Sequence, residues 1–116
     1  MHLTRLAIDH IRSNPEGGWL TDGDARVAVA AALLHDIGHY PFSHAIEELG
    51  SPIVPHERGG RRLIEGSQIG PILEDAWGVD PRRVANFVDP NGADLPPADR
   101  LLRGVLSGAL DMDKLD

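Results

Sequence analysis

The apolar residues of this chain recur at helical spacing over most of its length. That spacing predicts helices over residues 2–13, 25–36, 43–49, 56–65, 69–76, 81–88 and 98–115. The segment that ends at residue 36 is apolar on nearly every face, which indicates a central, buried helix. Runs of β-branched residues are short, so local propensity also favours helices over strands. We therefore expect an all-α fold.

Polar, proline and glycine residues set the expected ends of these helices. Thr21 or Asp22 can cap the central helix, and Asp80 can cap the helix that begins with Pro81. The pair Gly59-Gly60 lies inside the predicted helix 56–65. Each of these glycines should weaken that helix by about 1 kcal/mol relative to alanine.

The composition indicates one small globular domain. The chain has 116 residues, of which 41% are hydrophobic and only 4% aromatic. That length supports a single packed core. We see no internal repeat, no low-complexity tract and no linker to a second domain. One domain over residues 1–116 is therefore expected.

The charge of the chain argues against general binding to nucleic acid. The formal net charge is −7, whereas binding to nucleic-acid phosphates depends on clustered lysine and arginine. Arginines do cluster at residues 58–62 and at Arg82-Arg83. We expect the first of these clusters to form a solvated surface.

Cysteine is absent from the chain, which excludes disulfides, thiolate metal ligands and a catalytic thiol. Polar residues interrupt any apolar start that a signal peptide would need. The longest fully apolar run, residues 27–34, is far shorter than a membrane span. We expect a cytoplasmic protein without a membrane partner.

Histidine and acidic residues gather in the middle of the chain. A window of 22 residues holds four of the six histidines, with carboxylates beside them: His35, His39, His44 and His56, and Asp36, Glu47 and Glu57. Imidazole and carboxylate groups are ligands for Zn, Mn, Fe or Ni-like ions. An unpaired Asp36 at the end of a buried helix would be costly, and a metal ion is one suitable partner. By itself, a His-Asp pair more often marks a helix C-terminus with a solvated aspartate than a metal site.

The string from His35 to Glu47 reads HDIGHYPFSHAIE. It resembles the signature of HD-superfamily phosphohydrolases, and more narrowly that of the deoxynucleoside triphosphate triphosphohydrolase-like branch. His56-Glu57 resembles the family's later His-Glu pair, and LDMDKLD at residues 110–116 resembles its late aspartate motif. The resemblance extends from His2 to Asp116 and implies an HD-domain helical bundle. Since the family's domain extends further on both sides, we expect a partial domain, cut at both ends.

The resemblance implies a site for one divalent metal ion, which could be Mn, Fe, Zn, Ni or Mg. Its ligands would be a histidine of the first helix, the His-Asp pair and a late aspartate: His2, His35, Asp36 and Asp113. His10 is the alternative to His2, and Asp111 is the alternative to Asp113. Side chains of neighbouring helical residues point about 100° apart, so His35 and Asp36 could coordinate the ion from one side only. The other ligands must then come from distant parts of the chain.

The resemblance also implies a set of catalytic residues: His39, His44, Glu47 and His56. His39 or His44 would protonate the leaving oxygen, with Glu47 orienting the imidazole. Glu57 could orient His56 in the same way. Lys114 matches a position that contacts substrate phosphate.

The implied activity is hydrolysis of a deoxynucleoside triphosphate to nucleoside and tripolyphosphate. One alternative is another HD phosphohydrolase, acting on a nucleoside monophosphate, a guanosine polyphosphate or a cyclic nucleotide. A second alternative is a non-catalytic fragment that binds metal or nucleotide. The expected partner is a nucleotide. Because members of the family often assemble as dimers or tetramers, the resemblance also implies a homo-oligomer.

Overall fold

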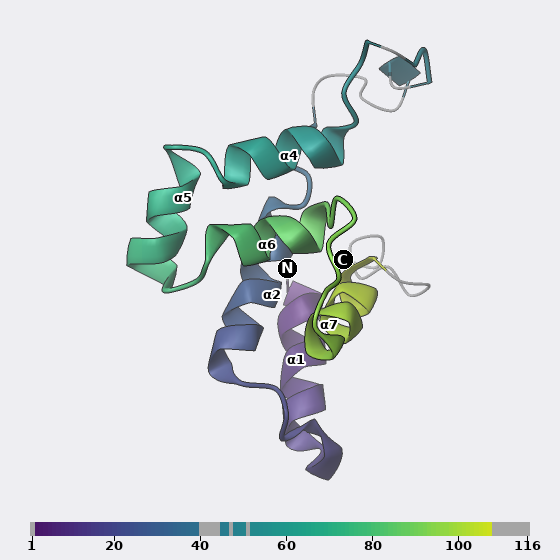
Figure 1. Cartoon of the computed structure of the whole chain (residues 1–116). Helices are drawn as coiled ribbons and strands as arrows, with labels where there is room; N and C mark the ends of the chain where they lie inside the picture. The colour runs from purple at the N-terminus through teal and green to yellow at the C-terminus, as the bar shows by residue number, and fades with distance from the viewer. Residues whose placement is uncertain (1, 40–44, 47, 51, 108–116) are drawn as a thin grey trace.

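The computed structural model describes residues 2–39, 45, 46, 48–50 and 52–107 (Figure 1). Its elements follow in chain order: α1 (His2–Ser13), the short 3-10 helix η1 (Pro15–Gly17), α2 (Asp22–Leu34), α4 (His56–Ile64), α5 (Ile69–Ile72) with its π-helical continuation η2 (Leu73–Trp77), α6 (Pro81–Val88) and α7 (Pro97–Ser107). The described ranges contain no strand. The predicted all-α class is therefore confirmed. None of the helices in these ranges combines the length and the hydrophobicity that a membrane span requires.

The predicted helices agree with the observed ones except near the ends. The central helix stops at Leu34, two residues before its predicted end, because the chain enters a series of tight turns there. In the predicted helix 43–49, residues 45 and 46 are helical, and residues 43, 44 and 47 lie outside the described ranges. The last predicted helix, 98–115, begins one residue earlier, at Pro97. Its part beyond residue 107 lies outside the described ranges.

Hydrogen bonds identify the residues that cap α2 and α6. Thr21, rather than Asp22, is the N-cap of α2: its Oγ1 accepts from the Asp24 amide at 3.1 Å, and its own amide donates to Asp24 Oδ2 at 2.9 Å. This reciprocal pair is a capping box, which satisfies two amides at the helix start. Asp80 caps α6 by accepting from the amide of Arg82 at 2.9 Å.

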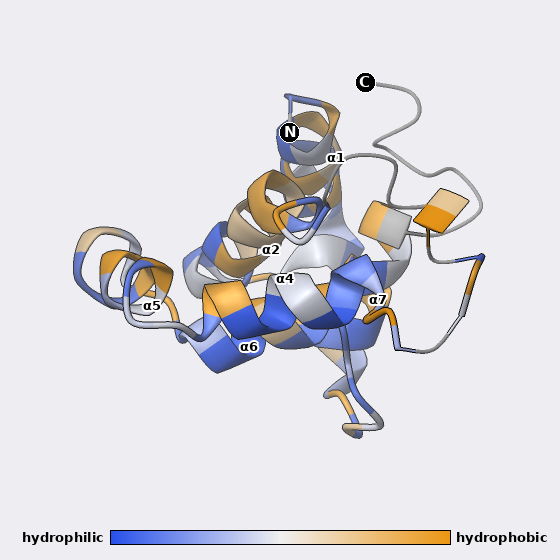
Figure 2. Cartoon of the chain, turned by 90° about the horizontal axis from the view of Figure 1, so that it is seen from above, coloured by the Kyte–Doolittle hydropathy of each residue, from blue (hydrophilic) through white to orange (hydrophobic). Residues whose placement is uncertain are grey.

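Helix α2 is the central helix of the fold, as its apolar sequence predicted. Figure 2 shows its mostly hydrophobic character, and its residues from Val27 to Ala31 are all buried. α1, α6 and α7 pack against α2, and α4 packs on α6. These helices contribute the remaining core residues, which include Ile8, Ile64, Val84, Phe87 and Leu102. The burial of their apolar surface is the main source of stability.

An ion cluster joins three of the helices near the core. Arg83 of α6 donates from Nε to Asp99 Oδ2 of α7 at 3.0 Å and from Nη2 to Asp99 Oδ1 at 2.5 Å. The same Nη2 donates to Asp24 Oδ1 of α2 at 2.5 Å. The side chain of Asp99 is only 4% exposed, and that of Asp24 is 13% exposed. A planar guanidinium bridging two carboxylates fixes the angles between α2, α6 and α7.

The ion cluster should make folding stability depend on acid pH. Burial tends to raise the pKa of Asp24, but hydrogen bonds from Arg83 and Thr21 outweigh it, so this pKa lies below its usual value. A lowered folded-state pKa stabilises the fold above the unfolded value of about 3.9, and this stabilisation is lost as pH falls through the folded pKa.

We expect the free energy of unfolding to fall more steeply below about pH 5 in the wild type than in Asp24→Asn, which cannot titrate at this position. Urea unfolding followed by circular dichroism between pH 3 and pH 6 would measure both slopes. Parallel curves would contradict a role for Asp24 in this pH dependence.

Candidate metal centre

Three side chains that sequence analysis singled out lie together at one end of α2. Ligand atoms of Asp36, His39 and His56 all lie within 4.8 Å of one another. Asp36 Oδ1 is 3.0 Å from His39 Nε2. The rings of His39 and His56 stack, with centroids 3.8 Å apart and planes inclined by 19°. Two segments that are distant in sequence therefore meet in one cluster.

Tight turns after α2 direct the first two of these side chains. The amide of Ile37 donates to the Leu34 carbonyl at 3.0 Å, and the amide of His39 donates to the Asp36 carbonyl at 3.0 Å. Each bond spans three residues, which is a tighter winding than in an α-helix. Asp36 and His39 are also three residues apart, and this winding brings their side chains to the same side. We call residues 35–39 the His-Asp turn.

The third side chain, His56, is the first residue of α4, which rests directly on the His-Asp turn. A Cβ built on Gly38 would lie 1.9 Å from the carbonyl oxygen of His56 and 2.4 Å from the amide nitrogen of Gly60. Gly60 itself is buried, and its own Cβ position would lie 3.5 Å from the Gly38 nitrogen. The two backbones approach too closely for a side chain at Gly38, so glycine at this position allows His56 to reach His39.

His35 is oriented toward the same carboxylate. Its Nδ1 lies 2.9 Å from the Ala32 carbonyl oxygen, which accepts a hydrogen bond from it, so Nε2 carries the lone pair in the neutral ring. That Nε2 lies 3.1 Å from Asp36 Oδ2. A histidine that donates its other ring proton to a backbone carbonyl is the usual arrangement of a metal ligand.

The spacing of His35 and Asp36 fits a divalent ion. Two ligand atoms that each lie about 2.1 Å from an ion, at a right angle, are about 3.0 Å apart. A lone pair of His35 and a carboxylate oxygen at 3.1 Å repel each other unless a proton or a cation lies between them. The donor pair of His35 and Asp36 and its spacing thus suit a metal ion.

Other predicted site residues lie outside this cluster. His2 is the exposed first residue of α1, and Figure 1 shows that end of α1 beside the C-terminal half of α2. His10, its alternative, belongs to the last turn of α1. Neither is part of the cluster among the described residues. The remaining predicted residues lie outside the described ranges: His44, Glu47, Asp111, Asp113 and Lys114.

Glu57 makes the contact that the sequence suggested for it. Its Oε1 lies 3.3 Å from His56 Nε2, and the side chain of His56 is only 13% exposed. A carboxylate in this position holds the imidazole in one orientation. His56 thus has one ring face against His39 and one nitrogen directed to Glu57.

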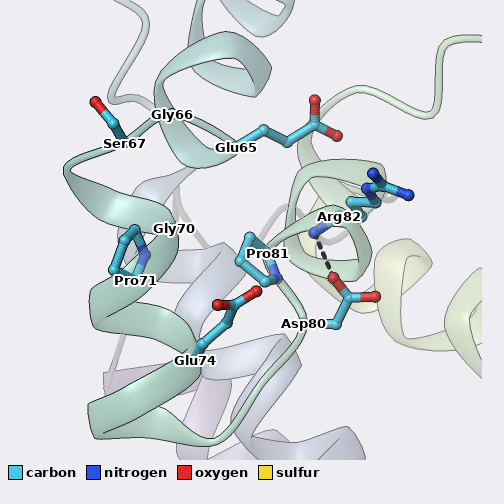
Figure 3. Close-up of a pocket in the computed structure, with 9 residues that line it drawn as sticks. All are labelled: Glu65, Gly66, Ser67, Gly70, Pro71, Glu74, Asp80, Pro81 and Arg82. Atoms are coloured by element: carbon cyan, nitrogen blue, oxygen red, sulfur yellow. Dashed lines mark hydrogen bonds between the residues drawn. The ribbon is translucent and has the colours of Figure 1, made fainter.

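A pocket with a volume of about 490 Å³ lies elsewhere in the molecule, between the α4–α5 region and the start of α6 (Figure 3). Glu65, Glu74, Asp80 and Arg82 are its charged lining residues. None of the predicted catalytic, metal-binding or substrate-binding residues lines it. The cluster of Asp36, His39 and His56 and this pocket are therefore separate features.

Comparisons with known proteins agree with the geometry. The family model described as HD domain matches residues 2–104. The uncharacterized protein MG461 homolog of Mycoplasma pneumoniae is 31% identical over 94% of this chain and 27% of its own length. The uncharacterized protein YwfO of Bacillus subtilis is 29% identical over 97% of this chain and 24% of its own length. No solved structure gave a significant match.

The chain belongs to the HD domain family. This family consists generally of hydrolases, its domains bind divalent metal ions, and it suggests metal-dependent phosphohydrolase chemistry. The chain spans about a quarter of the length of the curated relatives it matches.

Proposed function

We propose that this chain carries the metal centre of a phosphohydrolase that converts deoxynucleoside triphosphates to nucleoside and tripolyphosphate. The observation that carries the proposal is the contact of Asp36 with His35 through one oxygen and with His39 through the other. Family membership supports phosphohydrolase chemistry. The choice of triphosphate rests on the resemblance of residues 35–47 to the triphosphohydrolase-like branch.

His35 and Asp36 would hold the ion in this proposal, because their ligand atoms have the separation that one ion requires. His2 and Asp113 complete the ligand set by resemblance to the family pattern. A divalent ion bound there supplies a positive charge that polarises a phosphoryl oxygen and lowers the pKa of a water molecule.

The neighbouring histidines would handle protons and phosphate oxygens. His39 lies 3.0 Å from Asp36, and His56 stacks on His39, so both imidazoles lie beside the proposed ion position. An imidazole there can donate a proton to the leaving oxygen or a hydrogen bond to phosphate. Glu57 would hold the imidazole of His56 in one orientation for this purpose. His44, Glu47 and Lys114 join the site by resemblance, as further proton and phosphate contacts.

Metal content tests the site directly. We expect one tightly bound transition metal ion per chain after reconstitution with Mn, Fe or Zn, and its loss in Asp36→Ala. Asp75→Ala is the matched control, because it removes an exposed carboxylate of η2 that belongs to no predicted site. Elemental analysis of the purified proteins would give the ratio. A wild-type chain without metal after reconstitution would refute the proposal for this chain.

A panel of nucleotides then tests the reaction. We expect tripolyphosphate and deoxynucleoside as products, with turnover lost in Asp36→Ala and kept in Asp75→Ala. Turnover of nucleoside monophosphates, guanosine polyphosphates or cyclic nucleotides alone would assign the site to a different HD phosphohydrolase. Nucleotide binding without any turnover would indicate a non-catalytic binding module.

A further inference from the structure

Arg61 links the helix that carries His56 to the C-terminal end of α6. Its Nη1 donates to Asn86 Oδ1 at 2.8 Å and to the backbone oxygen of Asp89 at 2.6 Å. Its Nη2 donates to Glu65 Oε1 at 3.0 Å, within α4 itself. The side chain of Arg61 is only 20% exposed. The prediction of a solvated arginine cluster at residues 58–62 is therefore wrong for Arg61, although Arg58 and Arg62 are exposed.

The position of α4 depends on contacts of this kind, because the helix has little stability of its own. It is nine residues long, contains Gly59 and Gly60, and has no side-chain cap at Pro55. A helix of that length is marginal in water without tertiary packing. The glycines also leave only small side-chain contacts on the face that meets the His-Asp turn. An additional anchor is needed to fix how far α4 is rotated and shifted along its neighbours.

Arg61 is suitably placed to be that anchor. It directly follows Gly60, whose Cβ position would lie 3.5 Å from the Gly38 nitrogen and 3.6 Å from Val88 Cγ1 of α6. The face of α4 that includes Gly60 is therefore enclosed by the His-Asp turn and by α6. Charge-assisted hydrogen bonds to a side-chain oxygen and a backbone carbonyl at the end of α6 restrict rotation and sliding of α4.

We propose that Arg61 is a positioning residue of the metal centre, which holds His56 against His39 by fixing α4 on the end of α6. Arg61 acts through His56 and needs no contact with the ion or the substrate. Its effect on metal affinity rests on the proposed function, whereas its effect on the contact between the two histidines does not.

The test compares Arg61→Ala with Arg62→Ala, which removes the same charge from an exposed neighbour on the same helix. The first readout is the nuclear Overhauser cross-peak between the ring protons of His39 and His56 in the metal-free chain. We expect Arg61→Ala to lose this cross-peak while its circular dichroism remains helical, and Arg62→Ala to keep it. The second readout is Mn²⁺ affinity, which should fall by roughly tenfold or more in Arg61→Ala alone.

Two outcomes would overturn the proposal. One is an unchanged cross-peak in folded Arg61→Ala. The other concerns Asn86→Ala, which removes the side-chain acceptor of Arg61 on α6, keeps the Asp89 carbonyl and leaves α4 intact. If Arg61→Ala does not fold, a weakened cross-peak in Asn86→Ala supports the proposal and an unchanged one refutes it. Since the cross-peak requires neither metal nor nucleotide, it remains decisive if the proposed phosphohydrolase activity proves wrong.

Discussion

Gly38→Ala is expected to lower metal affinity by roughly 10- to 100-fold, although it adds a single methyl group. That methyl carbon would lie 1.9 Å from the His56 carbonyl oxygen and 2.9 Å from the Gly60 Cα. Both obstacles are backbone atoms, which cannot rotate away as a side chain could. The His-Asp turn and α4 must therefore separate by about 1 Å, because carbon and oxygen atoms that are not bonded require more than 3 Å.

The separation removes the geometry on which the proposed site depends. His56 moves with α4, while Asp36 and His39 stay with the turn, so the ring stack of 3.8 Å cannot persist. Overpacking of this kind also costs about 1–3 kcal/mol of folding stability. The φ angle of Gly38 is not in the left-handed region, so steric overlap alone accounts for the expected effect.

Gly59→Ala provides the matched control for this experiment. Its methyl carbon would lie 3.6 Å from the Gly38 oxygen and 3.9 Å from the Gly38 Cα, which are ordinary contact distances. This substitution should keep metal affinity and stabilise α4 by up to about 1 kcal/mol. Titration with Mn²⁺ and thermal unfolding of both variants would separate the two effects. Equal metal affinity in Gly38→Ala and the wild type would show that the close approach is not required.

The helices could be predicted because each carries its own local signals. The cap residue Asp80 followed by Pro81 placed the start of α6, and the apolar run of α2 identified the central helix. The end of α2 was less certain, because the apolar pattern continues toward Asp36 while the backbone changes to tighter turns. Hydrogen bonds that span three residues instead of four leave no trace in hydrophobic periodicity.

The site could be predicted only in part, for a different reason. The motif around His35-Asp36 identified the family, and the structure brings Asp36, His39 and His56 together. The close packing of the His-Asp turn on α4, however, depends on the absence of a side chain at Gly38. Residues 59 and 60 counted against a helix when each was judged by propensity alone. These glycines allow the backbone of Gly38 to approach α4 closely, and this contact is known only from the tertiary structure.

The role of Arg61 could not be predicted from the sequence for a similar reason. A run with three arginines in five positions has the pattern of a solvated surface, and Arg58 and Arg62 follow that pattern. The partners of Arg61 at the end of α6 lie 25 and 28 residues further along the chain. One partner is a backbone carbonyl, which no residue type marks. Arginine contacts of this kind become visible only after α4 and α6 have been packed together.

Arg83→Ala should have the largest effect on stability, lowering the free energy of unfolding by about 3–5 kcal/mol. The substitution leaves Asp99, whose side chain is 4% exposed, and Asp24, at 13%, without their common cation. Two neighbouring buried carboxylates without a counterion repel each other and cannot regain their hydration. Domains of this size are typically stable by about 5–15 kcal/mol, so a loss of this size removes a large part of the folding free energy.

Neighbouring variants distinguish this cause from a general loss of arginine. Arg82→Ala removes an exposed side chain of the same type and should change the free energy by less than about 0.5 kcal/mol. Arg83→Lys keeps the charge but not the planar fork that binds Asp99 through two nitrogens, so an intermediate loss is expected. Urea unfolding at neutral pH, followed by circular dichroism, would rank the three variants.

The pH dependence of Arg83→Ala gives the sharpest test of this explanation. If the loss comes from carboxylates without a counterion, acid that protonates them should narrow the difference from the wild type. The wild type itself loses stability in the same range, because its Asp24 is stabilised in the charged form by Arg83 and Thr21. The two curves should therefore converge as pH falls toward 3. A constant difference across pH would instead assign the loss to packing of the arginine side chain on α6.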